Sequence, residues 1–309
     1  MVRPFRFALQ WNTFEHPSEI ATLARRAESL GYDELYSHDH IGTANAVDPF
    51  VPLMVAAAAT TRLRVGPLVI NNELHHPALL ARTAATVDRL TEGRLVLGMG
   101  TGYSQDEHDA IGLELRPPRQ RVERFAESLQ VLRELLDGGA SHVDGVHHHL
   151  DVSDLGVRPT QTRLPILVGG HGRRVLAAAA AHADIIQFTG LTLDASGQLS
   201  AGGFDLAAIV ERARWFDEMA GDRNDDIERS TLVQHVDIAD DAAGRVDAVA
   251  KRIGLAPDRV ATCPFVFVGS VAQVIDQLER LRETTGISHV VVRDPDGFIY
   301  YKEEVGGLV

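Results

Sequence analysis

The sequence predicts an α/β protein built as a (β/α)8 barrel, and three observations support this. Short strand-like runs alternate with helix-like runs along almost the whole chain, which is typical of a parallel sheet with right-handed crossovers. Eight such units can be counted across the 309 residues, and these barrels commonly exceed about 250 residues when their loops carry insertions. Because no Pro/Gly linker or internal repeat divides the chain, residues 1–309 are predicted to form a single domain.

The first four units are predicted where short apolar runs lie between turn residues. The alternation of Phe5, Phe7 and Leu9 indicates the first strand, and Gly31 suits the end of the helix that follows. Pro77 fits the first turn of the third helix. The predicted strands cover residues 5–10, 34–37, 63–70 and 94–99, and the predicted helices cover residues 17–30, 51–60 and 77–90.

The last four units are joined by longer connections. A glycine-containing loop that ends at Pro117-Pro118 precedes a long amphipathic helix with apolar residues at helical spacing. A hairpin over residues 142–150 is predicted as an insertion, and the Gly/Ser/Thr-rich residues 189–203 are predicted as a mobile loop. The predicted strands cover residues 166–168, 184–188, 231–238 and 289–293, and the predicted helices cover residues 119–136, 173–182, 206–219 and 271–282.

Charge and composition exclude several classes of partner. The formal net charge is −13 and the arginines are scattered, whereas nucleic acids and anionic membranes require a concentrated basic face. The one cysteine, Cys263, has no partner for an internal disulfide, which favours a reducing compartment. No run approaches the roughly 20 apolar residues of a membrane span, and residues 1–10 lack a signal-peptide core. We therefore expect a soluble, cytoplasmic protein.

The tetrapeptide Ser37-His38-Asp39-His40 places titratable groups at the end of the second predicted strand. In a barrel, His38 and His40 could bind a metal, because alternate strand residues point the same way. A second interpretation places Asp39 and His40 at the rim as proton handlers or cofactor contacts, with His38 packed elsewhere. The C-terminal ends of barrel strands are where active sites lie, which favours the second interpretation. Further metal ligands would have to come from His171, His235 or Asp294, which lie in no metal-binding motif.

The segment Gly169-Gly170-His171-Gly172-Arg173 follows the fifth predicted strand. Its glycines allow a ligand to approach the backbone closely, and Arg173 or Arg174 can neutralise an anion. A tight strand-to-helix turn is the alternative, but such a turn rarely needs three glycines. We therefore predict a phosphate site at the start of the helix that follows.

Two other motifs are less informative. The run 98–103 is rich in glycine but lacks the G-x-G-x-x-G spacing, so a Rossmann-type NAD site is not expected. The backbone at Thr101 and Gly102 could still line a ring or a phosphate, although a plain turn explains it equally well. The run His147-His148-His149 cannot converge on a metal from a hairpin, because its side chains alternate between faces, and we expect it on the hairpin surface.

Taken as an ordered series, these segments resemble the luciferase-like flavin and deazaflavin oxidoreductases, in particular the branch that uses coenzyme F420. The resemblance spans most of the chain. It rests on residues 27–33 leading to Asp39-His40, on residues 58–66, on His76-Pro77 before Leu80-Ala81, on residues 86–94, on the 98–102 turn followed by Glu107, on residues 165–172 and on Ala183-Asp184.

The resemblance implies a fold, a cofactor and site residues. The family fold is a (β/α)8 TIM barrel with inserted segments, which agrees with the count of units. The family's glycine turn, here Gly169 to Arg173, holds the cofactor phosphate, and the histidine at His40 lies near the reactive ring. The family also carries a non-proline cis peptide that supports the ring, here expected at Leu68-Val69. A homodimer is expected by resemblance alone.

This chain departs from the sugar-phosphate dehydrogenases of the family. Those enzymes carry a tryptophan after the Asp-His pair and a glutamate in the strand-four turn, where this chain has approximately Ala44 and Tyr103. Tyr103 could donate a proton, or it could form part of the pocket wall without a chemical role. The resulting site prediction assigns catalysis to His40 and Tyr103. It assigns cofactor binding to Asp39, His40, Leu68, Val69, Thr101, Gly102, Gly169, Gly170, His171, Gly172 and Arg173, with no metal.

The expected reaction is hydride transfer between deazaflavin and a small-molecule or peptide-derived substrate, with reduction of an activated C=C or C=N bond preferred. Because FMN and coenzyme F420 both carry a ribityl phosphate, the glycine turn cannot distinguish them, and an FMN-dependent monooxygenase is the first alternative. A barrel that binds a cofactor without catalysis is the second alternative. The substrate is set by loops that have no readable motif.

Overall fold

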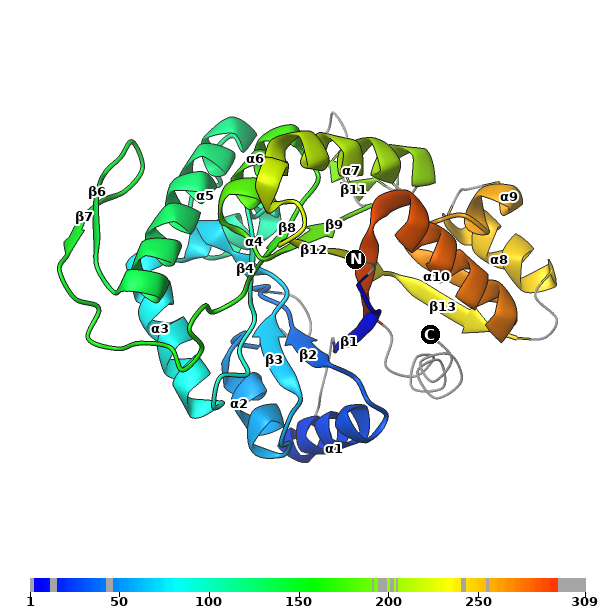
Figure 1. Cartoon of the computed structure of the whole chain (residues 1–309), viewed down its shortest axis with the longest axis horizontal. Coiled ribbons are helices and arrows are strands. Elements are labelled where there is room, and N and C mark those ends of the chain that lie inside the picture. The colour runs from blue at the N-terminus through cyan, green and yellow to red at the C-terminus, as the bar shows by residue number, and fades with distance from the viewer. Residues whose placement is uncertain are drawn as a thin grey trace.

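The computed structural model describes residues 3–11, 16–42, 47–190, 192–193, 199–200, 203, 205–239, 243–253 and 256–293. Its centre is a parallel sheet encircled by helices (Figure 1). The order of the strands in this sheet is β3-β2-β1-β15-β12-β9-β8-β5-β4. No described helix is long and apolar enough to cross a membrane.

The sheet closes on itself through β3 (Arg64–Pro67) and β4 (Ile70–Asn71), which are successive parts of one barrel strand. On one side, β3 pairs with β2 (Glu34–Ser37). On the other side, Val65 bridges to Leu95, and Ile70 pairs with Met99 of β5 (Leu97–Gly100). Eight strand positions therefore form a parallel barrel, which confirms the predicted (β/α)8 fold.

The other barrel strands and their helices lie close to their predicted positions. The strands are β1 (Arg6–Gln10), β8 (Ile166–Gly169), β9 (Ile185–Phe188), β12 (Glu228–Val233) and β15 (Ile287–Val292). The helices are α1 (Pro17–Ser29), α2 (Val51–Ala58), α3 (Pro77–Leu90), α5 (Pro118–Arg133), α6 (Arg173–His182), α7 (Leu206–Ala220) and α10 (Val271–Thr285). Local signals explain several ends: proline opens α1, α2, α3 and α5, and Ser270 with Gln273 forms a capping box at α10.

The prediction of one strand over residues 231–238 was wrong. The barrel strand β12 ends at Val233, and β13 (His235–Ile238) pairs instead with β14 (Val266–Gly269) outside the barrel. At the break, the backbone N–H of Gln234 donates to the carbonyl of Phe265 over 2.8 Å. The chain changes its pairing partner without a glycine or proline, so the sequence carries no turn signal there.

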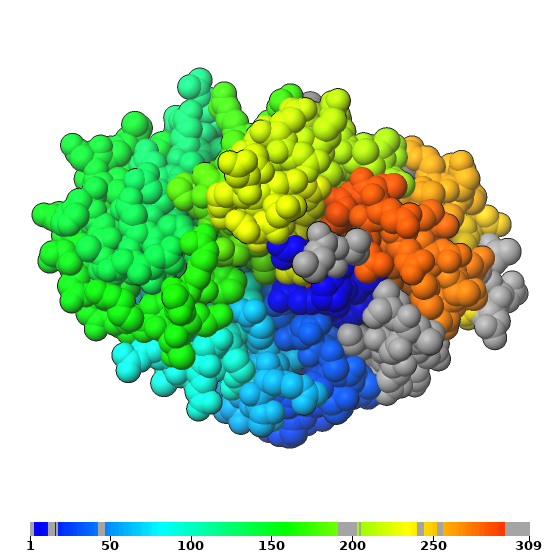
Figure 2. All heavy atoms as spheres, viewed as in Figure 1, coloured from blue at the N-terminus to red at the C-terminus, as the bar shows by residue number. Residues whose placement is uncertain are grey.

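Several inserted elements complete the fold. The predicted hairpin is confirmed as β6 (Ser141–Asp144) and β7 (His149–Val152), which pair antiparallel. The helices α4 (Gln105–Ala110), α8 (Ala243–Ile253) and α9 (Pro257–Val260) were not predicted. In the stretch 189–203, β10 (Thr192–Leu193) pairs with β11 (Leu199–Ser200), and residues 191, 194–198 and 201–202 lie outside the described part of the chain. Colours in Figure 2 place α8 and α9 at one end of the molecule.

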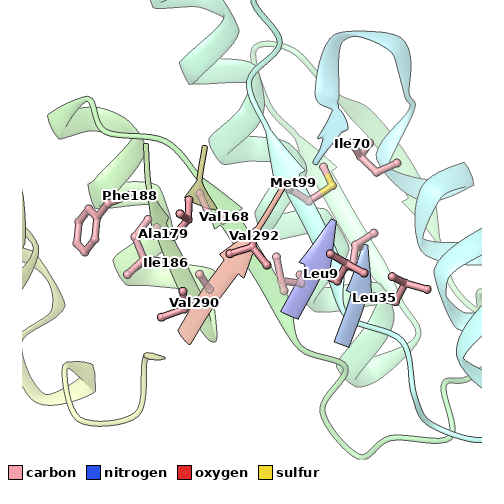
Figure 3. Packing of buried hydrophobic residues seen from close by; sticks show 14 of the residues in the cluster. Leu9, Leu35, Ile70, Met99, Val168, Ala179, Ile186, Phe188, Val290 and Val292 are labelled. Carbon is pink, nitrogen blue, oxygen red and sulfur yellow. The ribbon is translucent and has the colours of Figure 1, made fainter. Parts of the chain in front are cut away.

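Alternation along the strands separates two apolar regions. Leu9, Leu35 and Val168 point outward and pack in the large core between the barrel and its helices, as Figure 3 shows. The inward side chains form a smaller cluster inside the barrel, made by Ala8, Tyr36, Leu68, Val96, Leu167, Ile185 and Val291. The inward positions that follow on the same strands reach the C-terminal end of the barrel and line the cavity described below.

The N-terminal end of the barrel interior is closed by a buried charged cluster. Glu34 is fully buried, and its carboxylate lies 2.9 Å from Arg6 Nη2 and 2.7 Å from His289 Nε2. Tyr36 donates its hydroxyl to the same carboxylate over 2.6 Å. The cluster joins β1, β2 and β15, so it links the first strands of the barrel to the last.

Candidate active site

A cavity of about 590 Å³ opens at the C-terminal ends of the barrel strands. Gln10, Gln187 and Arg293 line it, and each lies two residues beyond an inward side chain of the interior cluster. The cavity also brings together eleven of the twelve residues predicted for the site. These are Asp39, His40, Leu68, Val69, Thr101, Gly102, Tyr103, Gly169, Gly170, His171 and Gly172.

His40 is held by a buried carboxylate. Its Nδ1 lies 2.7 Å from Glu107 Oε1, and the Glu107 side chain is 8% exposed. Because an ionised carboxylate can only accept, Nδ1 donates to it, and Nε2 is left to exchange a proton with a bound molecule. Glu107 is on α4, whose N-cap Ser104 accepts from the Glu107 backbone N–H. The pair can therefore fix the ring of His40 and its tautomer.

Asp39 organises the backbone at the edge of the cavity. Its Oδ2 accepts from the backbone N–H of Asn71 over 2.9 Å and from His75 Nε2 over 3.0 Å. Asn71 in turn lies against Gly102, where a Cβ would stand 2.1 Å from Asn71 Oδ1. Asp39 thus holds the end of β4 and the residues that follow it in place, and Asn71 of β4 lies against the turn after β5.

The peptide bond between Leu68 and Val69 is cis, as the resemblance predicted. Gln10 Nε2 donates to the carbonyl of Leu68 over 2.6 Å, and Gln10 Oε1 is buried at the cavity without a partner among the described atoms. Val69 packs over three glycines: a Cβ on Gly100 would lie 2.6 Å from Val69 Cγ2, and a Cβ on Gly98 or on Gly169 would lie 3.3 Å from Val69 Cγ1. The glycines therefore make room for Val69 at the floor of the cavity.

The glycine turn leads directly into the first turn of α6. Gly172 is the N-cap of α6, and no side chain caps this end. A Cβ on Gly172 would meet nothing within 4 Å, so open space lies in front of the first turn. Arg173 differs from its predicted role: its side chain is exposed and its guanidinium lies 4.9 Å from the centroid of the Trp215 ring, outside the cavity lining. Only its backbone N–H remains at the start of the helix.

His171 is held beside the turn by its partners on the neighbouring loop. Its Nδ1 lies 2.9 Å from Thr189 Oγ1, and Arg212 Nη1 donates to the carbonyl of Thr189 over 2.8 Å. Burial, assisted by the charge of Arg212, lowers the pKa of His171 to about 4. His171 is therefore neutral at pH 7 in the cofactor-free protein and adds no positive charge beside the glycine turn.

Tyr103 lies beside His40, with ring centroids 6.2 Å apart in an edge-to-face arrangement, and it is 42% exposed. Burial raises the pKa of the Tyr103 hydroxyl and Glu107 raises it further, while Arg293 lowers it. The hydroxyl therefore keeps its proton at pH 7. Its position fits both predicted roles, as a proton donor and as a wall of the pocket. Ala44 lies outside the described residues.

His38 and the hairpin histidines lie outside the lining of the cavity. The His38 ring lies 5.4 Å from that of His40, but His38 does not line the cavity. Among the described residues, no three His, Cys, Asp or Glu side chains are placed to hold a metal ion, and Asp294 is not described. His148 was expected on the hairpin surface, but it is buried 2.9 Å from Ser128 Oγ of α5, because the hairpin folds back against that helix.

Sequence reasoning missed several residues of the cavity. Gln10, Gln187 and Arg293 could have been found by continuing the inward alternation of their strands to the C-terminal end. Glu107 entered only as part of the resemblance, without a role, and Arg121 carried no signal, because both lie on helices whose approach to the cavity depends on the path of the long loop between β5 and α5.

The residues present fit a ring-bearing cofactor with a phosphate tail. The uncapped start of α6, with open space before Gly172, suits a phosphate. The unpartnered Gln10 Oε1 offers an acceptor to a donor on a ring lying against Val69. Fold and site together define a (β/α)8 barrel with a cavity at the C-terminal ends of its strands that is suited to a phosphorylated ring.

Comparison of the sequence with known protein families identifies the family to which this barrel belongs. Residues 2–202 match the luciferase-like monooxygenase family, and the chain belongs to it. It is 32% identical over 190 residues to an F420-dependent glucose-6-phosphate dehydrogenase of Nakamurella multipartita, covering 59% of this chain and 55% of that protein. It is 30% identical over 162 residues to a 5,10-methylenetetrahydromethanopterin reductase of Archaeoglobus fulgidus, covering 52% and 46%. The chain spans about half the length of these curated relatives.

Solved structures share the fold over nearly the whole chain. The coenzyme F420-dependent tetrahydromethanopterin reductase of Methanopyrus kandleri superposes with a TM-score of 0.77 at 22% identity, covering 99% of each chain. The long-chain alkane monooxygenase LadA also gives a TM-score of 0.77, at 15% identity, covering 99% of this chain and 91% of that one. The barrel is therefore common to proteins whose names describe different reactions.

Proposed function

We propose that this protein is an oxidoreductase that moves a hydride between coenzyme F420 and an organic substrate. The observation that carries the proposal is the cavity itself, in which the uncapped glycine turn of α6 and the His40–Glu107 pair line the same space. The name of the F420-dependent glucose-6-phosphate dehydrogenase that the chain resembles supports deazaflavin as the cofactor. Reduction of an activated C=C or C=N bond is the preferred reaction.

The residues of the cavity have different proposed roles, which follow from their positions. The backbone donors at the start of α6 bind the phosphate of the cofactor, and Gln10, Leu68 and Val69 support its ring. His40 holds or moves a proton at Nε2 while Glu107 fixes Nδ1. When bound, deazaflavin supplies two-electron hydride transfer with little reactivity toward oxygen, whereas reduced FMN activates oxygen.

Parallel titrations with coenzyme F420 and FMN test the cofactor, with ligand fluorescence as the readout. We expect saturable quenching of deazaflavin fluorescence and weaker binding of FMN. Tighter binding of FMN, with oxygen uptake after its reduction, would instead establish the monooxygenase alternative. Binding of either cofactor without turnover of any activated alkene or imine would leave a cofactor-binding barrel without catalysis.

The role of His40 is tested by His40→Ala, with His149→Ala as the matched control because His149 is exposed on the hairpin. We expect His40→Ala to lower turnover by about 100-fold, the lower range for a general acid or base, while cofactor affinity changes much less. Equal turnover in the variant and the wild type would remove His40 from the mechanism.

A homodimer is also proposed from the family likeness, and light scattering in solution measures the oligomeric state.

A further inference from the structure

Arg121 is a buried cation that faces the cavity. It lies one turn into α5, is 7% exposed, and is part of the cavity lining. Its Nη1 donates to the backbone carbonyl of Arg116 over 2.6 Å. Its Nε is buried and has no hydrogen-bond partner among the described atoms. The guanidinium therefore has unused donors in a place sheltered from water.

The charges around Arg121 are unbalanced. The nearby carboxylate, Glu73, is already shared by two other arginines: Arg116 Nη1 lies 2.8 Å from Oε2 and Arg124 Nη1 lies 3.2 Å from Oε1. Within the described part of the chain, no carboxylate lies within ion-pair distance of Arg121. Burial lowers the pKa of Arg121, and the attraction of Glu73 only partly opposes this. A buried cation without an anionic partner is costly, and a bound anion removes that cost.

We infer that Arg121 forms an anion-binding subsite in the wall of the cavity, which takes a carboxylate or phosphate group of the bound molecule. It differs in kind from the glycine turn, because Arg121 supplies a full charge and planar side-chain donors, whereas the turn supplies backbone N–H groups. The helices that carry the two features, α5 and α6, pack against each other, and both features line one cavity. The anionic group belongs either to the tail of the cofactor or to the substrate. The subsite itself does not depend on the proposed function, whereas the choice between these two sources rests on it.

Calorimetric titration of the cofactor-free protein with inorganic phosphate tests the subsite without any need for turnover. The wild type should bind phosphate saturably, and Arg121→Gln should weaken binding at least about tenfold, as expected for loss of a charge-assisted hydrogen bond. Arg119→Gln is the matched control, because Arg119 lies on the same helix with its side chain 74% exposed. Arg121→Lys keeps the charge and should retain part of the affinity, which separates a loss of charge from a loss of folding.

Two further titrations distinguish the source of the anion. If Arg121→Gln weakens binding of coenzyme F420 but not of its phosphate-free deazaflavin chromophore, the cofactor supplies the anion. If phosphate still binds to the F420-saturated wild type but not to F420-saturated Arg121→Gln, the substrate supplies it. Absence of deazaflavin binding would refute the proposed function and leave the phosphate result standing. Equal phosphate affinity in the wild type and Arg121→Gln, or no saturable binding to the wild type, would overturn the inference.

Discussion

Replacing Glu34 with glutamine should destabilise the fold more than any change at an exposed carboxylate. The Glu34 carboxylate is fully buried between Arg6, His289 and the Tyr36 hydroxyl. Glutamine keeps the shape but removes the anion, so that His289 loses its carboxylate partner and Arg6 retains only Glu228, whose Oε2 lies 3.0 Å from Arg6 Nη2. Removing one partner of a buried pair costs about 3–5 kcal/mol, and the conserved shape of the amide places this change near about 3 kcal/mol.

This cost can be measured as a shift in melting temperature. At about 2 °C per kcal/mol for a large domain, Glu34→Gln should lower the melting temperature at pH 7 by about 6 °C, followed by circular dichroism. Glu123→Gln is the control, because Glu123 is 42% exposed and its shortest ion pair is with Arg119, which is 74% exposed, so the variant should change the melting temperature by less than about 2 °C. A similarly small shift for Glu34→Gln would refute the assignment of Glu34 as a structural charge.

The same variant has a defined pH dependence. Burial alone would raise the pKa of Glu34, but His289 and Arg6 more than offset this and hold the pKa well below its usual range. A carboxyl group with a lowered pKa in the fold contributes stability above its unfolded pKa of about 4.3, and this contribution is lost as the pH falls toward the folded value. Urea unfolding should therefore show a constant difference between wild type and Glu34→Gln from pH 7 to about 5.5, and a shrinking difference below about pH 4. A stability difference between the two proteins that grows on acidification would contradict the lowered pKa of Glu34 in the fold.

Two other predictions follow from single positions. Gly98→Ala should lower the free energy of unfolding by about 1–3 kcal/mol in urea titration, because its Cβ would stand 2.2 Å from the carbonyl oxygen of Pro67, while Gly172→Ala, with nothing within 4 Å, should change it little. Equal stability of the two variants would show that the backbone at Gly98 relaxes freely. Burial raises the pKa of the Cys263 thiol to about 11, so it should react with Ellman's reagent at pH 8 far more slowly in the folded protein than in urea, and comparable rates would show that Cys263 is accessible.

The regular part of the fold could be predicted because each barrel unit carries its own local signals. Pro77 opens α3 where predicted, and the apolar run at Ile166 forms β8. The break after Val233 could not be predicted, because β13 is specified by its partner β14, and pairing between distant segments leaves no local mark. α4 was missed because it has only six residues and no clear apolar period.

The site was predictable where it depends on backbone and not where it depends on side-chain direction. The glycine turn at Gly169 to Gly172 and the strand-end pair Asp39-His40 line the cavity as expected. Arg173 turns to Trp215 because a helical side chain points along the helix surface, and sequence spacing alone does not show which neighbour it meets. The pairing of His40 with Glu107 joins residues 67 apart, and it needs the tertiary fold.

The position of β15 has a consequence for how the chain folds during synthesis. β15 lies between β1 and β12, and Arg6 pairs with His289. Because the ribosome releases the N-terminal strands first, β1 keeps an unpaired edge until the residues of β15, 287–292, have emerged. Until then, Glu34 carries its charge without His289, so the nascent barrel lacks the contact that later locks its first strands to its last. Closure of the barrel is therefore a late, long-range step, which favours slow folding and dependence on chaperones.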